Sequence, residues 1–273
     1  MMDRYAVMGN PVAHSKSPRI HALFAEQTSQ QLQYDAILVE KDGFREAVAD
    51  FLRQGGKGLN ITVPFKEEAW ALAATRSDRA ERAGAVNTLV LDESGRHFGD
   101  NTDGAGLVRD LLHNHGAVFK NKRLLLVGAG GAARGVIEPL LGESPTLLVI
   151  ANRTSAKAVE LARLFCELGH TEGCGLDAVH GQAFDIIINA TAASLSAKVP
   201  ALPESVITTD SWCYDMMYAD KATAFMDWAQ QLGAARCMDG LGMLVEQAAE
   251  SFCLWRNVRP DTQPVINAIR GQY

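Results

Sequence analysis

Lys66 is the residue whose type and position best suit proton transfer. It ends the run Asn60-Ile61-Thr62-Val63-Pro64-Phe65-Lys66, in which a strand pattern gives way to a helical one. Pro64 fits the first position of a helix, which would put Lys66 in the first turn, where the helix dipole disfavours its ammonium form. Asn60 and Thr62 share one face of the strand and could hold a substrate. We expect an acid/base lysine; the alternative is an ordinary solvated lysine.

Two further polar clusters are candidates for substrate binding. Ser15 and Ser17 precede an expected helix, where hydroxyls and free backbone N–H groups can hold a carboxylate. Asn87 and the run Asp100-Asn101-Thr102-Asp103-Gly104 form the other cluster. The alternative is that Ser17 and Asp103 simply cap the helices that follow them.

A glycine-rich turn predicts a dinucleotide site. The apolar strand Arg123–Val127 leads directly into Gly128-Ala129-Gly130-Gly131-Ala132-Ala133, a G-x-G-x-x-A pattern that a helix follows. The first glycine allows a tight turn, the second lets backbone approach a pyrophosphate, and the small last residue lets the helix pack on the strand. The N–H groups at the helix start would bind the phosphates. A lone glycine pattern is weak, but the strand before it and the helix after it strengthen the prediction.

The strand after this motif indicates NADP rather than NAD. The expected strand Thr146–Ala151 runs into Asn152-Arg153-Thr154, and Lys157 follows one helical turn on. An NAD site usually carries an acidic residue here to bind the ribose 2′-hydroxyl. A guanidinium, a hydroxyl and an ammonium suit a 2′-phosphate instead. The alternative is a solvated basic helix start.

Short apolar strands alternate with helical patterns along the chain, which predicts an α/β fold of βαβ units with mostly parallel sheets. The expected strands are Tyr5–Met8, Gln33–Val39, Gly58–Thr62, Val86–Leu91, Arg123–Val127, Thr146–Ala151, Asp185–Asn189 and Trp212–Asp215. The expected helices are Pro18–Gln30, Gly43–Gln54, Pro64–Ala73, Gly104–His115, Ala132–Leu141, Ser155–Leu168, Ala222–Leu232, Gly240–Arg256 and Asp261–Arg270.

Two domains are expected from this pattern. Residues 1–103 would form an N-terminal α/β substrate-binding and catalytic domain, onto which residues 240–273 pack back. Residues 104–239 would form a Rossmann-type NADP-binding domain. The active site would then lie in the cleft between the two domains. The helix from Gly240 would bring Gln247 to the substrate.

Composition argues against several other classes of protein. The net charge of −6 leaves no basic face for nucleic acid, and no apolar run reaches the ~20 residues that span a bilayer. Five cysteines, an odd number without a C-x-x-C pair, indicate reduced thiols in the cytoplasm. His113 and His115 are two apart on an expected helix and so point in different directions, which argues against a metal site. We expect a cytoplasmic enzyme with a small-molecule substrate and no metal, nucleic-acid or membrane partner.

Ordered motifs over almost the whole chain resemble the shikimate dehydrogenase family. These motifs are Gly9-Asn10-Pro11, His14 to Pro18, Asn60 to Lys66, Gly84 to Thr88, Asn101 to Gly104, Gly128 to Ala132, Asn152 to Thr154 and Asp239 to Leu244. The resemblance implies NADPH-dependent, reversible reduction of 3-dehydroshikimate to shikimate, a step of aromatic amino-acid biosynthesis. The sequence leaves open whether the enzyme is a monomer or a homodimer.

The resemblance also implies a role for individual residues. Lys66 and Asp103 would form the catalytic pair. The substrate would be held by Ser15, Ser17, Asn60, Thr62, Lys66, Asn87, Asp103, Tyr218 and Gln247. The cofactor would be bound by Asp78, Gly128, Ala129, Gly130, Gly131, Ala132, Asn152, Arg153, Thr154, Lys157, Met216 and Gly240.

One loop departs from the family pattern. After Asn189-Ala190-Thr191 the family usually continues with serine and glycine residues, whereas this chain has Ala192-Ala193-Ser194-Leu195. The loop borders the cofactor in relatives, and we expect this departure to leave the function unchanged.

Three alternative functions differ in the residues that they require. A broader quinate/shikimate dehydrogenase using NAD would carry an acidic residue where Asn152 and Arg153 stand. A methylenetetrahydrofolate dehydrogenase would not need Ser15 and Ser17 or the motif from Asn101 to Gly104. A non-catalytic cofactor sensor would keep the glycine turn without needing both Lys66 and Asp103.

Overall fold

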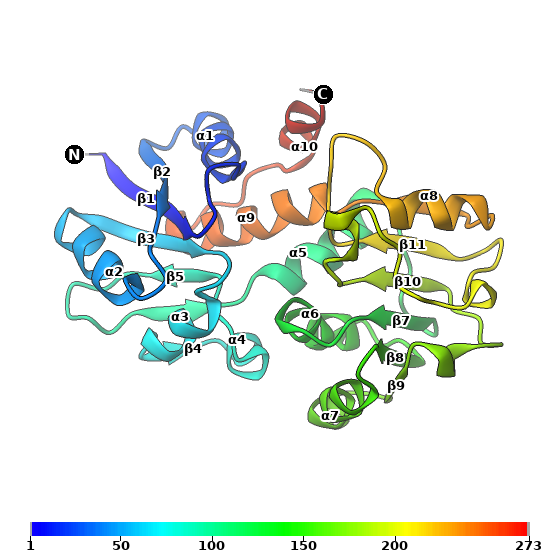
Figure 1. The fold of residues 1–273 in the computed structure, drawn as a ribbon. Helices are drawn as coiled ribbons and strands as arrows, with labels where there is room; N and C mark the ends of the chain where they lie inside the picture. Colours follow the sequence, from blue (N-terminus) through cyan, green and yellow to red (C-terminus); the bar gives the residue numbers. More distant parts are fainter. Residues whose placement is uncertain (1, 272–273) are drawn as a thin grey trace. The chain divides into compact units, whose positions relative to one another are not determined.

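The computed structural model describes residues 2–271, which fall into two compact units (Figure 1). The first unit comprises the chain up to Gly106 together with the segment from Leu244 onward, and the second runs from Leu107 to Met243. Both divisions fall a few residues beyond the expected domain boundaries. They lie inside the helices α5 (Asp103–Arg109) and α9 (Leu241–Arg256), where a continuous helix gives no compositional break.

The first unit contains a mixed sheet, with strands in the order β2-β1-β3-β5-β6-β4 across the described residues. The strands are β1 (Asp3–Gly9), β2 (Leu32–Leu38), β3 (Gly56–Ile61), β4 (Thr75–Arg76), β5 (Thr88–Val90) and β6 (Phe98–Asp100). Three of the five pairings among its described strands are parallel, as expected for mostly parallel pairing; the exception is β5, which runs antiparallel to both β3 and β6. A short connection joins β5 to β6, and antiparallel neighbours need no crossover helix.

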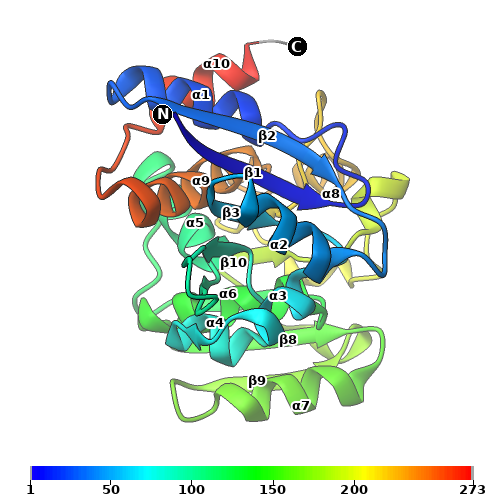
Figure 2. The ribbon, with the colours of Figure 1, turned by 90° about the vertical axis from the view of Figure 1, so that its left-hand side faces the viewer.

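Helices cover both faces of this sheet. They are α1 (Ser17–Gln27), α2 (Phe44–Arg53), α3 (Lys66–Leu72), α4 (Asp78–Ala83), the part of α9 from Leu244, and α10 (Gln263–Arg270). On α2 the buried residues Phe44, Val48 and Phe51 recur at helical spacing and pack with Met8 and Leu59 of the sheet. An aromatic cluster from α1, β2 and α9 packs separately, and α1 lies beside α10 (Figure 2).

The second unit contains a fully parallel sheet, with strands in the order β12-β11-β10-β7-β8-β9 across the described residues. The strands are β7 (Arg123–Val127), β8 (Leu147–Asn152), β9 (Thr171–Gly175), β10 (Ile186–Asn189), β11 (Trp212–Asp215) and β12 (Arg236–Met238). The helices are α6 (Gly131–Gly142), α7 (Ser155–Phe165) and α8 (Ala224–Gln231). The strand order reverses between β7 and β10, and ligands of such sheets bind at the carboxyl ends of the strands at that point.

The elements that the sequence did not predict are short or lie at sheet edges. The expected strands Arg123–Val127 and Trp212–Asp215 are confirmed with the same bounds, because buried central strands are continuous apolar runs. β4, β9 and β12 are edge strands, and β9 reads Thr-Glu-Gly-Cys-Gly, which has no apolar run. The helix expected over residues 104–115 changes to a π-helical turn at Asp110–Asn114. Across residues 2–271, no helix combines the length and apolar character that crossing a membrane requires.

Candidate active site

Lys66 and Asp103 form an ion pair within the first unit. The Lys66 Nζ lies 2.6 Å from the Asp103 Oδ2, and the two side chains are only 29% and 15% exposed. Lys66 is the first residue of α3 and Asp103 the first of α5. The expectation that Pro64 begins the helix is wrong: Phe65 is the N-cap, and Pro64 lies outside the helix after a cis peptide bond. The lysine nevertheless stands at the helix start.

Asn87 holds the other oxygen of the Asp103 carboxylate. Its Nδ2 donates to Asp103 Oδ1 at 2.8 Å, to Thr102 Oγ1 at 3.0 Å and to Gln247 Oε1 at 3.4 Å. Its Oδ1 accepts the Thr102 backbone N–H at 2.9 Å. The orientation of Asp103 is therefore fixed on both sides, by an ammonium and by an amide. Its carboxylate is engaged in the site and does not serve only as a helix cap.

Asn60 is enclosed by protein groups. Its Oδ1 accepts the Tyr34 hydroxyl at 2.7 Å. Its Nδ2 lies 2.9 Å from Ser251 Oγ, 3.2 Å from Thr88 Oγ1 and 3.3 Å from the Asn87 carbonyl oxygen. Asn60 is 6% exposed. The geometry favours a supporting role beneath Asn87, whereas the sequence analysis predicted that Asn60 holds the substrate.

A buried histidine that the sequence analysis did not select lies beside this network. His21 of α1 stacks on Tyr34, with ring centroids 4.1 Å apart and planes 6° apart. Neither ring nitrogen has a hydrogen-bond partner among the described residues. Burial lowers the pKa of His21 to about 3, and the neighbouring Asn60 side chain, which favours the protonated ring, offsets only part of that fall. The imidazole is thus neutral near pH 7. In the sequence, the only feature that pointed to His21 was its position four residues after Ser17, which places the two residues on the same face of α1.

The two serines lie where α1 begins. The helix starts at Ser17 with Lys16 as its N-cap, so the alternative that Ser17 caps the helix is wrong. The Ser15 Oγ accepts the backbone N–H of Ser17 at 3.3 Å. Burial raises the pKa of Tyr34, and the nearby Ser17 side chain opposes that rise. Ser17 therefore adjoins the same polar network as Asn60.

Thr62 and Gln247 complete the set in the first unit. Thr62 follows β3 directly, and its backbone N–H donates to the Met8 carbonyl at 3.0 Å. Gln247 of α9 receives bonds from Asn87 and, at 3.4 Å, from Thr102 Oγ1. Chain segments far apart in the sequence thus bring Asn60, Lys66, Asn87, Asp103 and Gln247 into one connected group.

The glycine turn of the second unit fits a phosphate-bearing ligand. Gly128 has φ +118°, and a Cβ there would lie 3.3 Å from the Ala190 carbonyl oxygen, so a larger residue would be strained. A Cβ on Gly130 or Gly131 would meet no described atom within 4 Å, so the turn is open. No side chain caps the start of α6, and Ala132 in its first turn is exposed. Free N–H groups at such a start bind anions.

The end of β8 carries the residues expected to contact a 2′-phosphate. Asn152 closes the turn by donating from Nδ2 to the Thr154 carbonyl at 3.0 Å. Arg153, Thr154 and Lys157 are exposed around the start of α7, and no side chain caps that helix. The cationic and hydroxyl groups are therefore free to meet an anionic group, which is the chemistry that a 2′-phosphate requires.

Met216 and Gly240 are brought together in the second unit. The Gly240 backbone N–H donates to the Met217 carbonyl at 3.0 Å, and a Cβ on Gly240 would lie 2.3 Å from the Met216 carbonyl oxygen, so only glycine fits. Tyr218 is half-buried nearby in sequence, and burial raises its pKa.

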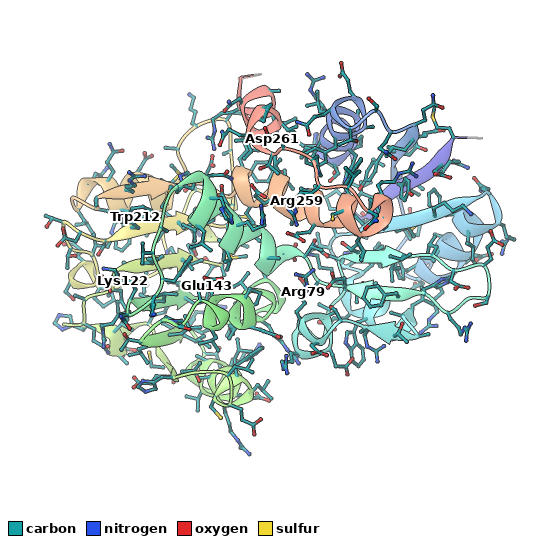
Figure 3. All side chains as sticks on the ribbon, turned by 180° about the vertical axis from the view of Figure 1, so that it is seen from behind. Arg79, Lys122, Glu143, Trp212, Arg259 and Asp261 are labelled. Atoms are coloured by element: carbon teal, nitrogen blue, oxygen red, sulfur yellow. The ribbon has the colours of Figure 1, made fainter. Side chains whose placement is uncertain are left out.

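Asp78 is an exposed residue at the start of α4 in the first unit. The adjacent Arg79, labelled in Figure 3, binds Asp100 through Nε at 2.8 Å and Nη2 at 2.5 Å. Burial alone would raise the pKa of Asp100, but the Arg79 guanidinium, the Ser77 hydroxyl and the Asn101 backbone N–H together outweigh burial and hold that pKa below its ordinary value. The ion pair between Arg79 and Asp100 therefore holds the segment that carries Asp78 against β6.

No metal site accompanies these groups in the described part of the chain, where no three His, Cys, Asp or Glu side chains gather. His115 instead lies 3.6 Å from the Asp110 carboxylate. Asp110 also accepts the Tyr214 hydroxyl at 2.7 Å.

Comparison with known proteins gives matches over most of the chain. The family model of the shikimate dehydrogenase substrate binding domain matches residues 7–89. The model of shikimate / quinate 5-dehydrogenase matches residues 110–208, and that of the shikimate 5′-dehydrogenase C-terminal domain matches residues 240–270.

Individual relatives extend over the full length. The chain is 57% identical over 272 residues to shikimate dehydrogenase (NADP(+)) of Alkalilimnicola ehrlichii, covering 100% of both chains. An Ael1 enzyme from Pseudomonas putida has a similar structure, with a TM-score of 0.93, 49% identity and 97% of each chain covered. Shikimate 5-dehydrogenase of Thermus thermophilus, solved with NADP(H) and shikimate, gives a TM-score of 0.88 at 32% identity, covering 100% of both chains.

Proposed function

Since the chain belongs to the shikimate dehydrogenase family, we propose that it reduces 3-dehydroshikimate to shikimate with NADPH, reversibly, and that Lys66 and Asp103 handle the proton. The observation that carries the residue assignment is the 2.6 Å contact between Lys66 and Asp103, with Asn87 on the second carboxylate oxygen. The ammonium is a proton donor held at a fixed position by an oriented base.

Reduction of the ketone to a secondary alcohol requires a hydride on carbon and a proton on oxygen. NADPH, when bound, supplies the hydride. Lys66 donates its proton to the oxygen as the alkoxide develops, and in the reverse direction it accepts the hydroxyl proton. Asp103 keeps the ammonium in place and accepts a hydrogen bond from the reacting hydroxyl. Asn87 prevents the carboxylate from rotating away.

Substrate contacts are assigned to the polar groups of the first unit around this pair. Ser15 and Ser17 hold the carboxylate, and Thr62, Asn87 and Gln247 hold ring hydroxyls. Hydroxyl and amide groups are suited to a polyhydroxylated acid because each donates and accepts hydrogen bonds. Tyr218 is a further substrate contact on the basis of the family resemblance, and Asn60 supports Asn87 from beneath.

Cofactor contacts are assigned to the second unit, with Asp78 added from the first on the basis of the resemblance. The turn from Gly128 to Ala132 binds the pyrophosphate, and Asn152, Arg153, Thr154 and Lys157 bind the 2′-phosphate. Met216 and Gly240 line the nicotinamide end. The open Gly130 and Gly131 and the uncapped starts of α6 and α7 support these assignments.

The decisive experiment follows the nicotinamide absorbance with 3-dehydroshikimate and NADPH, and in reverse with shikimate or quinate and either NADP⁺ or NAD⁺. We expect turnover of 3-dehydroshikimate with NADPH and of shikimate with NADP⁺, with NAD⁺ and quinate used far less well. Comparable rates with quinate and NAD⁺ would instead support the broader quinate/shikimate activity. Absence of turnover with every pair would contradict the proposal.

We also propose a cytoplasmic location and a monomeric or homodimeric state. The five cysteines are all free thiols in the structure, as expected in a reducing compartment. Cell fractionation tests the location, and light scattering of the purified chain gives the oligomeric state.

A further inference from the structure

Asp215 is a buried carboxylate at the carboxyl end of β11 that accepts hydrogen bonds from four protein groups. Its Oδ2 accepts the Ser194 hydroxyl at 2.5 Å and the Thr223 hydroxyl at 2.7 Å. Its Oδ1 accepts the Met217 backbone N–H at 3.0 Å and the Asn189 Nδ2 at 3.2 Å. The residue is 0% exposed, and no ion pair to it occurs among residues 2–271. Burying a charge costs free energy unless hydrogen bonds satisfy it, and here four donors do so. Such a set of contacts fixes the groups that donate to Asp215.

These donors come from two separate loops. Asn189 ends β10 and Ser194 lies in the 3₁₀ turn Ala193–Ser196, whereas Met217 and Thr223 belong to the segment between β11 and α8. Hydrogen bonds to the Asp215 carboxylate therefore link the loop after β10 to the loop after β11. Asn189 strengthens the first loop because its Oδ1 accepts both the backbone N–H and the hydroxyl of Thr191, at 3.1 and 2.7 Å.

Both loops adjoin residues assigned to the cofactor. Ala190 and Thr191 lie against Gly128 of the glycine turn. Met216 donates its backbone N–H to the Asn189 carbonyl at 3.0 Å. The loops follow β10 and β11, which lie on the opposite side of β7 from β8, the strand that Arg153 directly follows. A dinucleotide that straddles the reversal point places its 2′-phosphate half beyond β8 and its other half toward β10.

We propose that Asp215 is a positioning residue for the nicotinamide half of the cofactor, acting through the two loops that it joins. The proposal rests on the proposed function, because it needs NADP to bind at the glycine turn. Ser194 belongs to the segment in which this chain departs from the family's serine and glycine pattern, and its hydroxyl anchors the altered loop to Asp215. The altered loop therefore has an anchor of its own, the hydrogen bond from Ser194 to Asp215.

The test compares two serine variants of the same 3₁₀ turn in the full-length chain. Ser194→Ala removes one donor to Asp215, and Ser196→Ala removes an exposed hydroxyl two residues away. Titration calorimetry measures binding of NADP⁺ and of 2′,5′-ADP, which carries the 2′-phosphate half but lacks nicotinamide. Because hydrogen bonds to charged groups contribute ~1.5–3 kcal/mol, we expect Ser194→Ala to weaken NADP⁺ binding by roughly 10-fold or more. Binding of 2′,5′-ADP should stay unchanged, and Ser196→Ala should change neither.

Two further measurements separate positioning from general damage. Ser194→Thr keeps the hydroxyl and should restore NADP⁺ binding. In steady-state assays Ser194→Ala should raise the KM for NADPH and leave the KM for 3-dehydroshikimate unchanged. Equal weakening of both ligands, together with a lower melting temperature, would show a merely structural role and overturn the proposal, as would unchanged binding of NADP⁺. Failure of the unmodified chain to bind either ligand would instead contradict the proposed function.

Discussion

At the residue scale, the two charges of the candidate active site come from the first residues of two different helices. Lys66 opens α3 and Asp103 opens α5, and each side chain is more than two-thirds buried. A lysine at a helix N-terminus opposes the helix dipole, whereas an aspartate there is favoured. Pairing the two offsets the unfavourable position of the lysine while keeping a proton available at a fixed point.

Lys66→Ala should lower kcat by about 10²- to 10⁴-fold, the usual contribution of general acid–base catalysis. The shikimate KM should change much less, because other groups hold the carboxylate and the ring hydroxyls. Lys66→Arg should not restore kcat, because a guanidinium does not release its proton. Steady-state kinetics would check this, with the exposed Lys57→Ala as control. A normal kcat with only the KM raised would show that Lys66 is a binding group.

Arg153→Asp should weaken NADP binding far more than NAD binding, because a carboxylate would then face the 2′-phosphate. Loss of one charge-assisted contact amounts to about 1.5–3 kcal/mol. The ratio of kcat/KM for the two cofactors measures the effect. Arg163→Ala, which removes an exposed cation at the far end of α7, should leave that ratio unchanged. An unmodified protein that uses both cofactors equally would contradict this assignment.

His21 should make the folded state sensitive to mild acid. Its pKa is lowered from the ordinary value of 6.5 to about 3, so between those pH values the unfolded chain binds a proton that the folded chain does not. Stability therefore falls as the pH drops through this window, by about 2 kcal/mol between pH 7 and pH 5 from this residue alone.

Denaturant unfolding at pH 7 and pH 5 measures this effect, and His21→Phe should reduce the difference. The pKa of His97 is also lowered by burial, so part of the acid sensitivity should persist in the variant. The exposed His14→Ala is the control. An unchanged pH dependence in His21→Phe would show that the imidazole is not buried as a neutral group in solution.

The residues that carry chemistry were predictable from the sequence, but their surroundings were not. Lys66, Asp103 and the glycine turn stand in runs whose residue types suggest a role directly. The enclosure of Asn60 by Tyr34, Ser251 and Thr88 depends on contacts between distant chain segments, and no local pattern encodes such contacts. Asp215 was missed for the same reason, because a single acid after an apolar strand is typical of many turns.

At the element scale, one polar network joins β2, β3, the segment before β5, and α9 within the first unit. Tyr34 of β2 binds Asn60 of β3, which binds Ser251 of α9, and Asn87 continues the network to Asp103. Inside a sheet covered by helices, each of these groups would cost free energy if it lost its partner. The network therefore fixes the register of strands against helix as well as the orientation of the site.

Tyr34→Phe should destabilise the chain by about 1–3 kcal/mol, because the Asn60 carbonyl oxygen would be buried without a donor. The shikimate KM should also rise, because Asn60 would no longer hold Asn87 firmly. Urea unfolding and steady-state kinetics provide the measurements. Tyr5→Phe is a matched control, since Tyr5 is also buried and stacked on an aromatic ring but its hydroxyl contacts Arg256. Equal effects of the two variants on KM would contradict the role of the network.

The strand predictions were accurate where a strand is long or continuously apolar, and they missed strands of two to five residues without an apolar run. Central strands such as β7 are apolar throughout and stand out in the sequence. The edge strands β4, β9 and β12 are held mainly by backbone pairing to a neighbour, so their side chains carry little signal. The antiparallel β5 was expected as a strand, but its direction depends on which neighbour it meets.

At the scale of the whole molecule, the first unit is built from two pieces of chain and the second from one. The segment from Leu244 supplies Ser251 to Asn60 and the Trp255 indole N–H to the Leu89 carbonyl at 3.0 Å. The second unit, from Leu107 to Met243, holds its own parallel sheet and its own apolar clusters.

A chain ending at Met243 should therefore lose the first unit and keep the second. We expect such a chain to bind 2′,5′-ADP and to show no shikimate binding and no turnover. Titration calorimetry with each ligand, and limited proteolysis of the two units, would check this. Retained shikimate binding would show that residues up to Gly106 fold without α9 and α10.

The insertion of the second unit between the two pieces of the first also sets an order of events on the ribosome. The polypeptide is made from the N-terminus, and domains generally fold as units as they emerge. The second unit is complete once Met243 has left the exit tunnel. Asn60 of the first unit, by contrast, can bind Ser251 only after almost two hundred further residues have been synthesised. Until then Tyr5, Gly58 and Leu89 lack the Trp255 ring that packs on or binds to them. The nascent chain therefore carries an unfinished sheet for most of its translation, and it is there that chaperones should bind.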